Sequence, residues 1–124
     1  MGTPRPVNLN LMTIAFPLPA IVSILHRISG VILFLSMPFW IYALQQSLSS
    51  DNDFSQLQQC MSEGWIKFFV WLSLSALVYH FIAGVRHLFM DLGWGDSLQA
   101  GRVSSRMVML VSVIIILVVG YWLW

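Results

Sequence analysis

Three long runs of apolar residues, separated by two polar loops, set the pattern of this chain. The runs cover about residues 19–48, 64–91 and 103–124. As an α-helix, each run is long enough to cross a lipid bilayer, which takes about 20 residues. The pattern predicts an all-α membrane protein with a polar, proline-marked N-terminal arm over residues 1–18 and a three-helix transmembrane domain over residues 19–124.

Two local features refine this prediction. Pro38 lies inside the first run, where it frees a backbone carbonyl and predicts a kink in the helix. The first polar loop, residues 49–63, carries Phe54, Leu57 and Met61 at helical spacing. This spacing predicts a short amphipathic helix on the membrane surface.

The composition agrees with a membrane location and excludes several other classes of protein. Hydrophobic residues make up 58% of the chain and charged residues only 9%, whereas a soluble domain has roughly 25% charged residues. The net charge of +1 gives no sign of a nucleic-acid partner. Cys60 is the only cysteine, so the chain has neither a disulfide framework nor a cysteine metal site.

The distribution of basic residues predicts the topology. The loop over residues 49–63 contains no arginine or lysine, while five arginines lie near the opposite ends of the spans. These are Arg5, Arg27, Arg86, Arg102 and Arg106. The positive-inside rule then places the N-terminus and the second loop in the cytoplasm and the C-terminus in the periplasm. Cys60 would lie on the outer side.

The second run has a polar stripe with a histidine well inside the membrane. At 100° per residue, His80, Gly84, His87 and Asp91 fall within about 60° of one another. Ionisable groups at such depth are costly and usually functional. A neutral imidazole in a dry site is a good ligand for haem iron, and glycine one turn away would leave room for a flat ring. The alternative is that His80 only bonds to a neighbouring helix.

The first two spans are antiparallel, so the start of one meets the end of the other. This arrangement predicts a polar cluster of Ser23, His26, Arg27, Arg86, His87 and Asp91. With haem iron on His80, its propionates would reach the level of His26, Arg27 and His87, about 10 Å away. Alternatively, Arg27 only anchors the helix at the interface and Ser23 only bonds its own helix. A second axial histidine would have to come from another chain, which predicts a subunit of a larger assembly.

Three stretches carry a resemblance to a known family: Arg5-Pro6-Val7-Asn8-Leu9, Ser23-Ile24-Leu25-His26-Arg27-Ile28-Ser29-Gly30 and His80-x3-Gly84-x-Arg86-His87-x3-Asp91. They resemble the cytochrome b556 membrane-anchor subunits of succinate dehydrogenase (respiratory complex II), most closely the enterobacterial type. The resemblance covers nearly the whole chain, including the order of the spans and the sizes of the loops.

The resemblance implies a four-subunit complex in the bacterial cytoplasmic (inner) membrane. The partners would be a flavoprotein subunit, an iron–sulfur subunit and a second membrane-anchor subunit, with a trimer of heterotetramers as an open further step of assembly. Succinate would be oxidised in the flavoprotein, so no catalytic residue is expected in this chain. Electrons would pass through iron–sulfur clusters to ubiquinone.

The resemblance also implies roles for individual residues. His80 would be an axial ligand of haem b, and the sister anchor would supply the other ligand. Ser23 and Arg27 would border the ubiquinone site, and His26, Arg27 and His87 would lie near the haem propionates. Two other classes remain open: a fumarate reductase or other quinone cytochrome, and a cofactor-free anchor or small transport subunit. A b-type optical spectrum would exclude the cofactor-free alternative.

Overall fold

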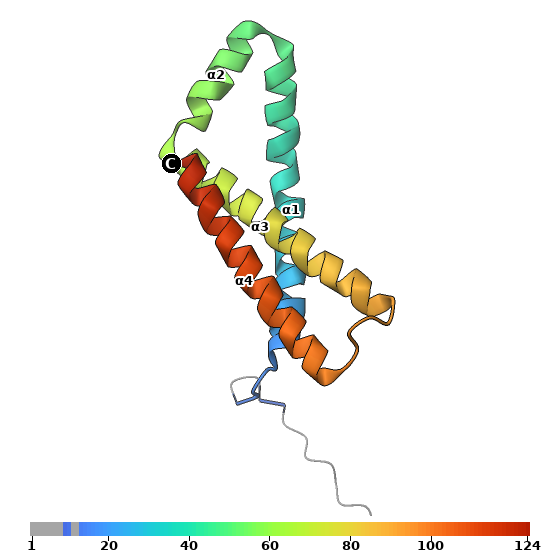
Figure 1. Cartoon of the computed structure of the whole chain (residues 1–124). Coiled ribbons are helices and arrows are strands. Elements are labelled where there is room, and N and C mark those ends of the chain that lie inside the picture. The colour runs from blue at the N-terminus through green and yellow to red at the C-terminus, as the bar shows by residue number, and fades with distance from the viewer. Residues whose placement is uncertain (1–8, 11–12) are drawn as a thin grey trace, which may run out of the picture.

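A computed structural model describes residues 9–10 and 13–124 of the chain, and all regular structure in this part is helical (Figure 1). The four helices are α1 (Leu18–Ser49), α2 (Asp51–Met61), α3 (Gly64–Asp91) and α4 (Leu98–Leu123). Three of them, α1, α3 and α4, are long and apolar enough to cross a membrane. The predicted all-α fold with three membrane spans is therefore confirmed. The predicted arm lies largely outside the described residues, and the topology stays a prediction.

The helix boundaries agree with the sequence pattern except at the start of α4. The helix α3 has the predicted limits, whereas α4 begins at Leu98, ahead of the predicted start at residue 103. The cause is a helix cap: the Ser97 hydroxyl accepts a hydrogen bond from the Ala100 N–H at 3.1 Å. The helix α1 continues through Pro38. The kink at that residue stays a prediction.

The first polar loop contains the short helix that its spacing predicts. Ser50 caps α2, because its side chain accepts from the Asp53 N–H at 3.1 Å and donates to Asp53 Oδ2 at 2.8 Å. This reciprocal pairing satisfies a free N–H of the first turn. The position of α2 on the membrane surface stays a prediction.

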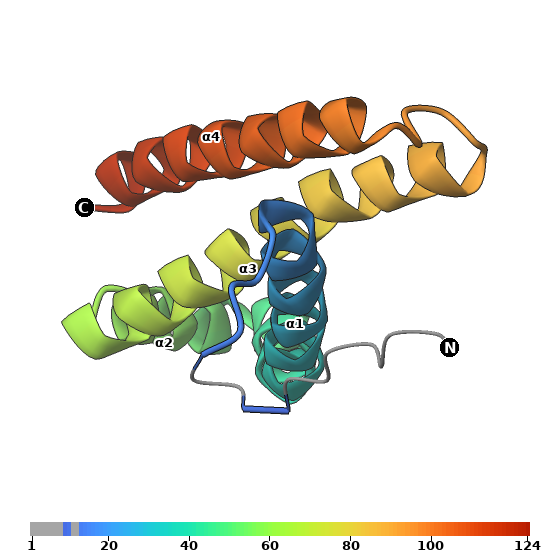
Figure 2. The same ribbon diagram turned by 90° about the horizontal axis from the view of Figure 1, so that it is seen from below.

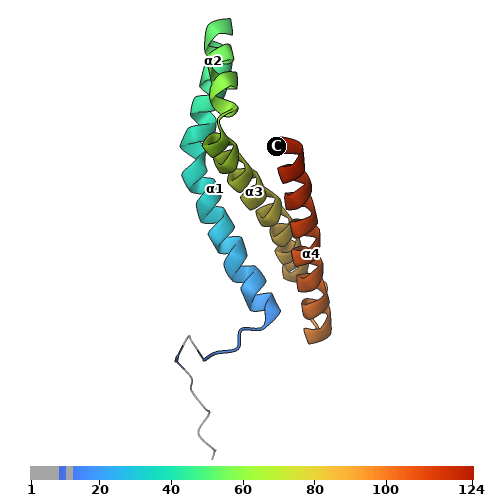
Figure 3. The ribbon, with the colours of Figure 1, turned by 90° about the vertical axis from the view of Figure 1, so that its left-hand side faces the viewer.

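The three spans cross one another and bring their ends together in two groups (Figures 1 and 3). At one end, here called the Asp91 end, the start of α1 lies with the end of α3 and the start of α4. The opposite end holds the start of α3 and the C-terminus of the chain. Figure 2, seen from below, shows α1 crossing α3. The helices α1 and α3 are therefore antiparallel, as predicted.

The three spans meet in one small core. Val22 of α1, Ala83 of α3 and Val108 of α4 pack together, fully or almost fully buried. A hydrogen bond adds to this packing: the Tyr79 hydroxyl of α3 donates to the Val22 carbonyl of α1 at 3.1 Å. Of the three core residues, Ala83 is the small residue of the kind that lets helix backbones approach closely in lipid. Many large apolar side chains are exposed, such as Phe34, and these faces suit lipid or further helices.

Candidate functional site

The His80 side chain of α3 is held by the backbone and a hydroxyl of α1. Its Nδ1 lies 3.0 Å from Ser29 Oγ and 3.1 Å from the His26 carbonyl oxygen. The Ser29 hydroxyl donates its own hydrogen to the same carbonyl at 2.7 Å. A carbonyl can only accept, so this contact requires a hydrogen on His80 Nδ1. In the neutral imidazole, Nε2 then carries the free lone pair.

Two residues that sequence reasoning did not assign complete this arrangement. Ser29 is buried and provides the hydroxyl beside His80. Gly30 allows the close approach, because a Cβ atom at this position would lie 3.1 Å from His80 Cε1. Both lie in the quoted motif around His26. The serine three residues after a histidine was a usable signal, since serine hydroxyls often bond to the carbonyl of residue i−3 or i−4.

His26 connects the other two histidines. Its ring stacks on the His80 ring with centroids 4.1 Å apart and planes 15° apart. The ring of His87 meets it edge-on at 5.0 Å. The prediction that His26 lies about 10 Å from His80 is therefore wrong. The register of α1 against α3 places His26 between the two, so both contacts form.

Gly84 also has a different neighbour from the expected one. From the sequence, this glycine was expected to leave room for a flat cofactor ring. In the structure, a Cβ at Gly84 would lie 3.3 Å from His26 Nε2, so an imidazole of this chain faces the glycine. His26 Nε2 is buried and has no hydrogen-bond partner among the described residues.

Ser23 and Arg27 lie one turn apart near the start of α1. Ser23 is half-buried, and its hydroxyl makes no hydrogen bond among the described residues. The remaining serines of α1 all donate to carbonyls of their own helix: Ser29, Ser36, Ser47 and Ser49. The alternative in which Ser23 only bonds its own helix is therefore wrong. Arg27 is exposed and has no ion pair or hydrogen bond in the described part of the chain.

Of the predicted polar cluster, the structure brings His26 and His87 into contact, while Arg86 and Asp91 do not join them. Arg86 is 6% exposed and turns to α4, where its Nε donates to Ser104 Oγ at 3.0 Å. Asp91 is exposed and forms no ion pair with any described residue. For Arg86 the prediction was wrong because successive helical residues point about 100° apart. With His87 on the α1 side of α3, its neighbour Arg86 faces α4.

The arrangement combines an imidazole held by two oxygens with three groups that have no partner among the described residues: a buried ring nitrogen of His26, the Ser23 hydroxyl and the Arg27 cation. All of them lie on α1 and α3. In the described part of the chain, no group of three His, Cys, Asp or Glu side chains is placed to hold a metal ion.

Comparisons with known proteins give a consistent result. A family model described as "Succinate dehydrogenase/Fumarate reductase transmembrane subunit" matches residues 1–119. A protein of Coxiella burnetii named "Succinate dehydrogenase cytochrome b556 subunit" is 48% identical over 125 residues, which is 100% of each chain. Proteins of the same name from Rickettsia typhi and Paracoccus denitrificans are each 32% identical, with 90% of this chain and 86% and 85% of theirs aligned.

Proposed function

The chain belongs to the family of succinate dehydrogenase/fumarate reductase transmembrane subunits, and we propose that it binds haem b and helps to form the ubiquinone-reduction site of a succinate:ubiquinone oxidoreductase. It is a multi-pass subunit of the bacterial inner membrane. In this proposal it carries no catalytic residue for succinate. A flavoprotein subunit oxidises succinate, and an iron–sulfur subunit delivers the electrons.

The observation that carries the haem proposal is the pair of oxygens beside His80 Nδ1, from which we infer that this nitrogen carries the hydrogen. This hydrogen is engaged by the His26 carbonyl and Ser29, and Nε2 makes no hydrogen bond to the described part of the chain. Protein histidines that ligate metals almost always donate their other ring N–H to such an oxygen, which fixes the ring and raises its basicity. The residues present therefore fit an axial ligand. When bound, the haem supplies one-electron redox chemistry.

The stacking of two histidines bears on what else would hold the haem. The rings of His26 and His80 lie face to face with planes 15° apart, so this arrangement gives no support to His26 as a second ligand. In this proposal a second membrane-anchor subunit would supply the other histidine.

His26, His87 and Arg27 are the residues of this chain that would accompany the haem propionates. His26 Nε2 is buried without a partner among the described residues, and buried polar atoms are nearly always hydrogen-bonded in a complete structure. A carboxylate would satisfy it if Nε2 carries a hydrogen. His87 contacts the same ring, and Arg27 provides a permanent positive charge one residue along α1.

Ser23 and Arg27 are the residues proposed for the quinone. They are four residues apart, so they project from one face of α1, and neither has a partner among the described residues. The Ser23 hydroxyl would donate a hydrogen bond to a quinone oxygen. The Arg27 guanidinium would stabilise the negative charge that develops on that oxygen during reduction. The iron–sulfur subunit and the sister anchor would complete the site.

The decisive test is an optical spectrum of the complex isolated with this chain. We expect a b-type band in the wild type and its loss, or a strong perturbation, in His80→Leu. Ser36→Ala is the matched control, because it alters a buried serine of α1 that bonds only to the Leu33 carbonyl. A wild-type complex without a b-type band would instead favour the cofactor-free anchor. An unchanged spectrum in His80→Leu would disprove the ligand assignment.

A further inference from the structure

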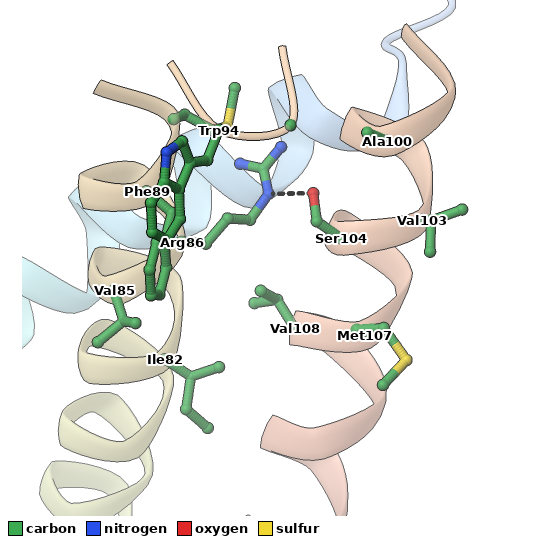
Figure 4. A pocket seen from close by; sticks show the side chains of 12 residues that line it. Ile82, Val85, Arg86, Phe89, Trp94, Ala100, Val103, Ser104, Met107 and Val108 are labelled. Carbon is green, nitrogen blue, oxygen red and sulfur yellow. Dashed lines mark hydrogen bonds between the residues drawn. The ribbon is translucent and has the colours of Figure 1, made fainter. Parts of the chain in front are cut away.

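A cavity of about 460 Å³ lies between the end of α3 and the start of α4 (Figure 4). All of its lining residues come from α3, α4 and the turn between them, so it shares no residue with the histidine cluster. Its walls are almost entirely apolar, and one charged residue, Arg86, lines it. An apolar wall with a single cation suggests a ligand that has both an apolar part and a negative charge.

The turn after α3 builds one wall of the cavity through its backbone geometry. Gly93 has φ of 80°, and its N–H bonds to the Met90 carbonyl at 2.9 Å. The next N–H, of Trp94, bonds to the Phe89 carbonyl at 3.0 Å. This is the Schellman ending of a helix, in which the residue after the glycine packs back on the last turn. The Trp94 ring accordingly stacks on Phe89, with centroids 5.5 Å apart.

The charge of Arg86 has no counter-ion in the described part of the chain. Its two hydrogen bonds go to neutral oxygens, Ser104 Oγ at 3.0 Å and the Gly101 carbonyl at 3.4 Å. The second distance is at the weak limit for a hydrogen bond. A guanidinium has five N–H donors, so most of its donor capacity is unused. A buried charge without an opposite charge is costly in a protein and more so in a membrane.

The nearby charged residues do not compensate it. Asp91 and Asp96 are exposed and form no ion pair with Arg86. Arg102 and Arg106 are exposed on the first turns of α4 and add further positive charge at this end. The N-terminus of α4 contributes partial positive charge as well. The cavity therefore attracts an anion.

The depth and the apolar wall specify which anion. Arg86 is five residues before Asp91, so it lies about 7.5 Å from the end of α3 at 1.5 Å per residue. If α3 ends at the outer edge of the headgroup region, Arg86 lies near the level of the phospholipid phosphates, since the headgroup regions add about 5–7 Å to each side of the hydrocarbon core. Phe89 and Trp94 suit the same interface. Further along the spans the wall becomes entirely apolar, with Ile82, Val85, Met107 and Val108.

We propose that this cavity binds an anionic phospholipid, with the headgroup phosphate on Arg86 and an acyl chain along the apolar wall. The lipid supplies both parts that the cavity lacks, a negative charge and an apolar chain. It is also present at high concentration in the membrane that surrounds α3 and α4. Bound there, it would hold the two helices together at the end where Arg86 donates hydrogen bonds to Ser104 and Gly101.

The test compares two lipids that differ in headgroup charge. The chain, purified with the subunits that accompany it, is stripped of lipid and then titrated with phosphatidylglycerol or phosphatidylcholine. Thermal unfolding and native mass spectrometry measure binding. We expect phosphatidylglycerol to bind at least about tenfold more tightly to the wild type, which is ~1.4 kcal/mol. Arg86→Gln keeps an amide donor for the neutral partners but removes the charge, and should reduce this preference to about twofold or less.

Two further variants separate the cavity from general surface charge. Val103→Trp fills the cavity from a half-exposed position and keeps Arg86, so it should weaken the binding of both lipids. Arg106→Gln removes an exposed cation of α4 outside the cavity and should behave as the wild type. If Arg86→Gln does not assemble, the wild-type preference and Val103→Trp decide the question.

Three results would overturn the proposal. Equal binding of the two lipids by the wild type would show that the cavity does not select an anionic lipid, because phosphatidylcholine carries the same phosphate but no net charge. Equal protection by inorganic phosphate at the same concentration would show a site for small anions and no lipid. Loss of the preference in Arg106→Gln to the same extent as in Arg86→Gln would show an effect of surface charge alone.

Discussion

Replacing Ser29 with alanine tests whether α1 orients the His80 imidazole for ligation. Ser29 Oγ lies 3.0 Å from His80 Nδ1, and the His26 carbonyl lies 3.1 Å from the same nitrogen. The substitution removes one of these two oxygens and leaves the carbonyl in place. We therefore expect His80 to keep its tautomer and the complex to retain haem, while the imidazole becomes less polarised.

The size of the effect follows from the lost contact. A hydrogen bond of this kind contributes about 1 kcal/mol net. For a one-electron couple, a tenfold change in the equilibrium constant, or ~1.4 kcal/mol, corresponds to 59 mV. If the whole lost hydrogen-bond energy acted on one oxidation state of the iron, the midpoint potential would therefore shift by about 40 mV. A less polarised imidazole is a weaker donor to iron. This disfavours the ferric state, so the potential should rise, with 40 mV as the upper limit.

Potentiometric titration of the b-type band measures this shift, and Ser36→Ala is the control. Ser36 is also buried in α1, and it donates to the Leu33 carbonyl at 2.9 Å without touching a histidine. Both variants should lose a similar amount of stability, about 1 kcal/mol, but only Ser29→Ala should change the potential. An unchanged potential in Ser29→Ala, or an equal shift in Ser36→Ala, would refute the orienting role.

Four other outcomes follow from the structure and the proposals. Gly30→Ala should lower haem content per complex at least severalfold, because the new Cβ would lie 3.1 Å from His80 Cε1; normal content would show that the ring can move aside. Ser23→Ala should lower quinone reduction about tenfold, or ~1.4 kcal/mol, with normal haem content, and wild-type activity would remove Ser23 from the quinone site. Arg27→Lys should cause a similar loss, since lysine lacks the guanidinium fork; a wild-type rate would mean that charge alone suffices. A membrane-impermeant thiol reagent should reach Cys60, which is exposed, only from outside, and labelling only from the cytoplasmic side would reverse the topology.

The spans were predictable because apolar runs report directly on burial in lipid, and the limits of α3 required nothing more. The start of α4 needed a different signal, the Ser97 cap, since its first turn is polar and lies outside the apolar run. Contacts between helices were harder to predict. The Ser29–His80 contact joins residues 51 positions apart, and hydrophobic periodicity says nothing about which serine meets which histidine.

His26 lies deeper along α1 than the sequence pattern predicts, and the bounds of the two helices explain why. His26 is eight residues after Leu18, the start of α1, because 26 − 18 = 8. The residue eight before Asp91, the end of α3, is Ala83, because 91 − 8 = 83. Antiparallel helices that share an end therefore place His26 opposite Ala83, midway between His80 and His87. An imidazole at that level reaches both neighbours.

The positions of these residues along α3 explain why this helix presents histidines to α1 and an arginine to α4. His80 and His87 are seven residues apart, almost two full turns, so both face α1. Arg86 lies one residue and about 100° away from this stripe, which directs it to α4 and the cavity there. Because Arg86 lies on the other side of the helix, its positive charge faces α4 and the cavity there, on a surface separate from the histidines.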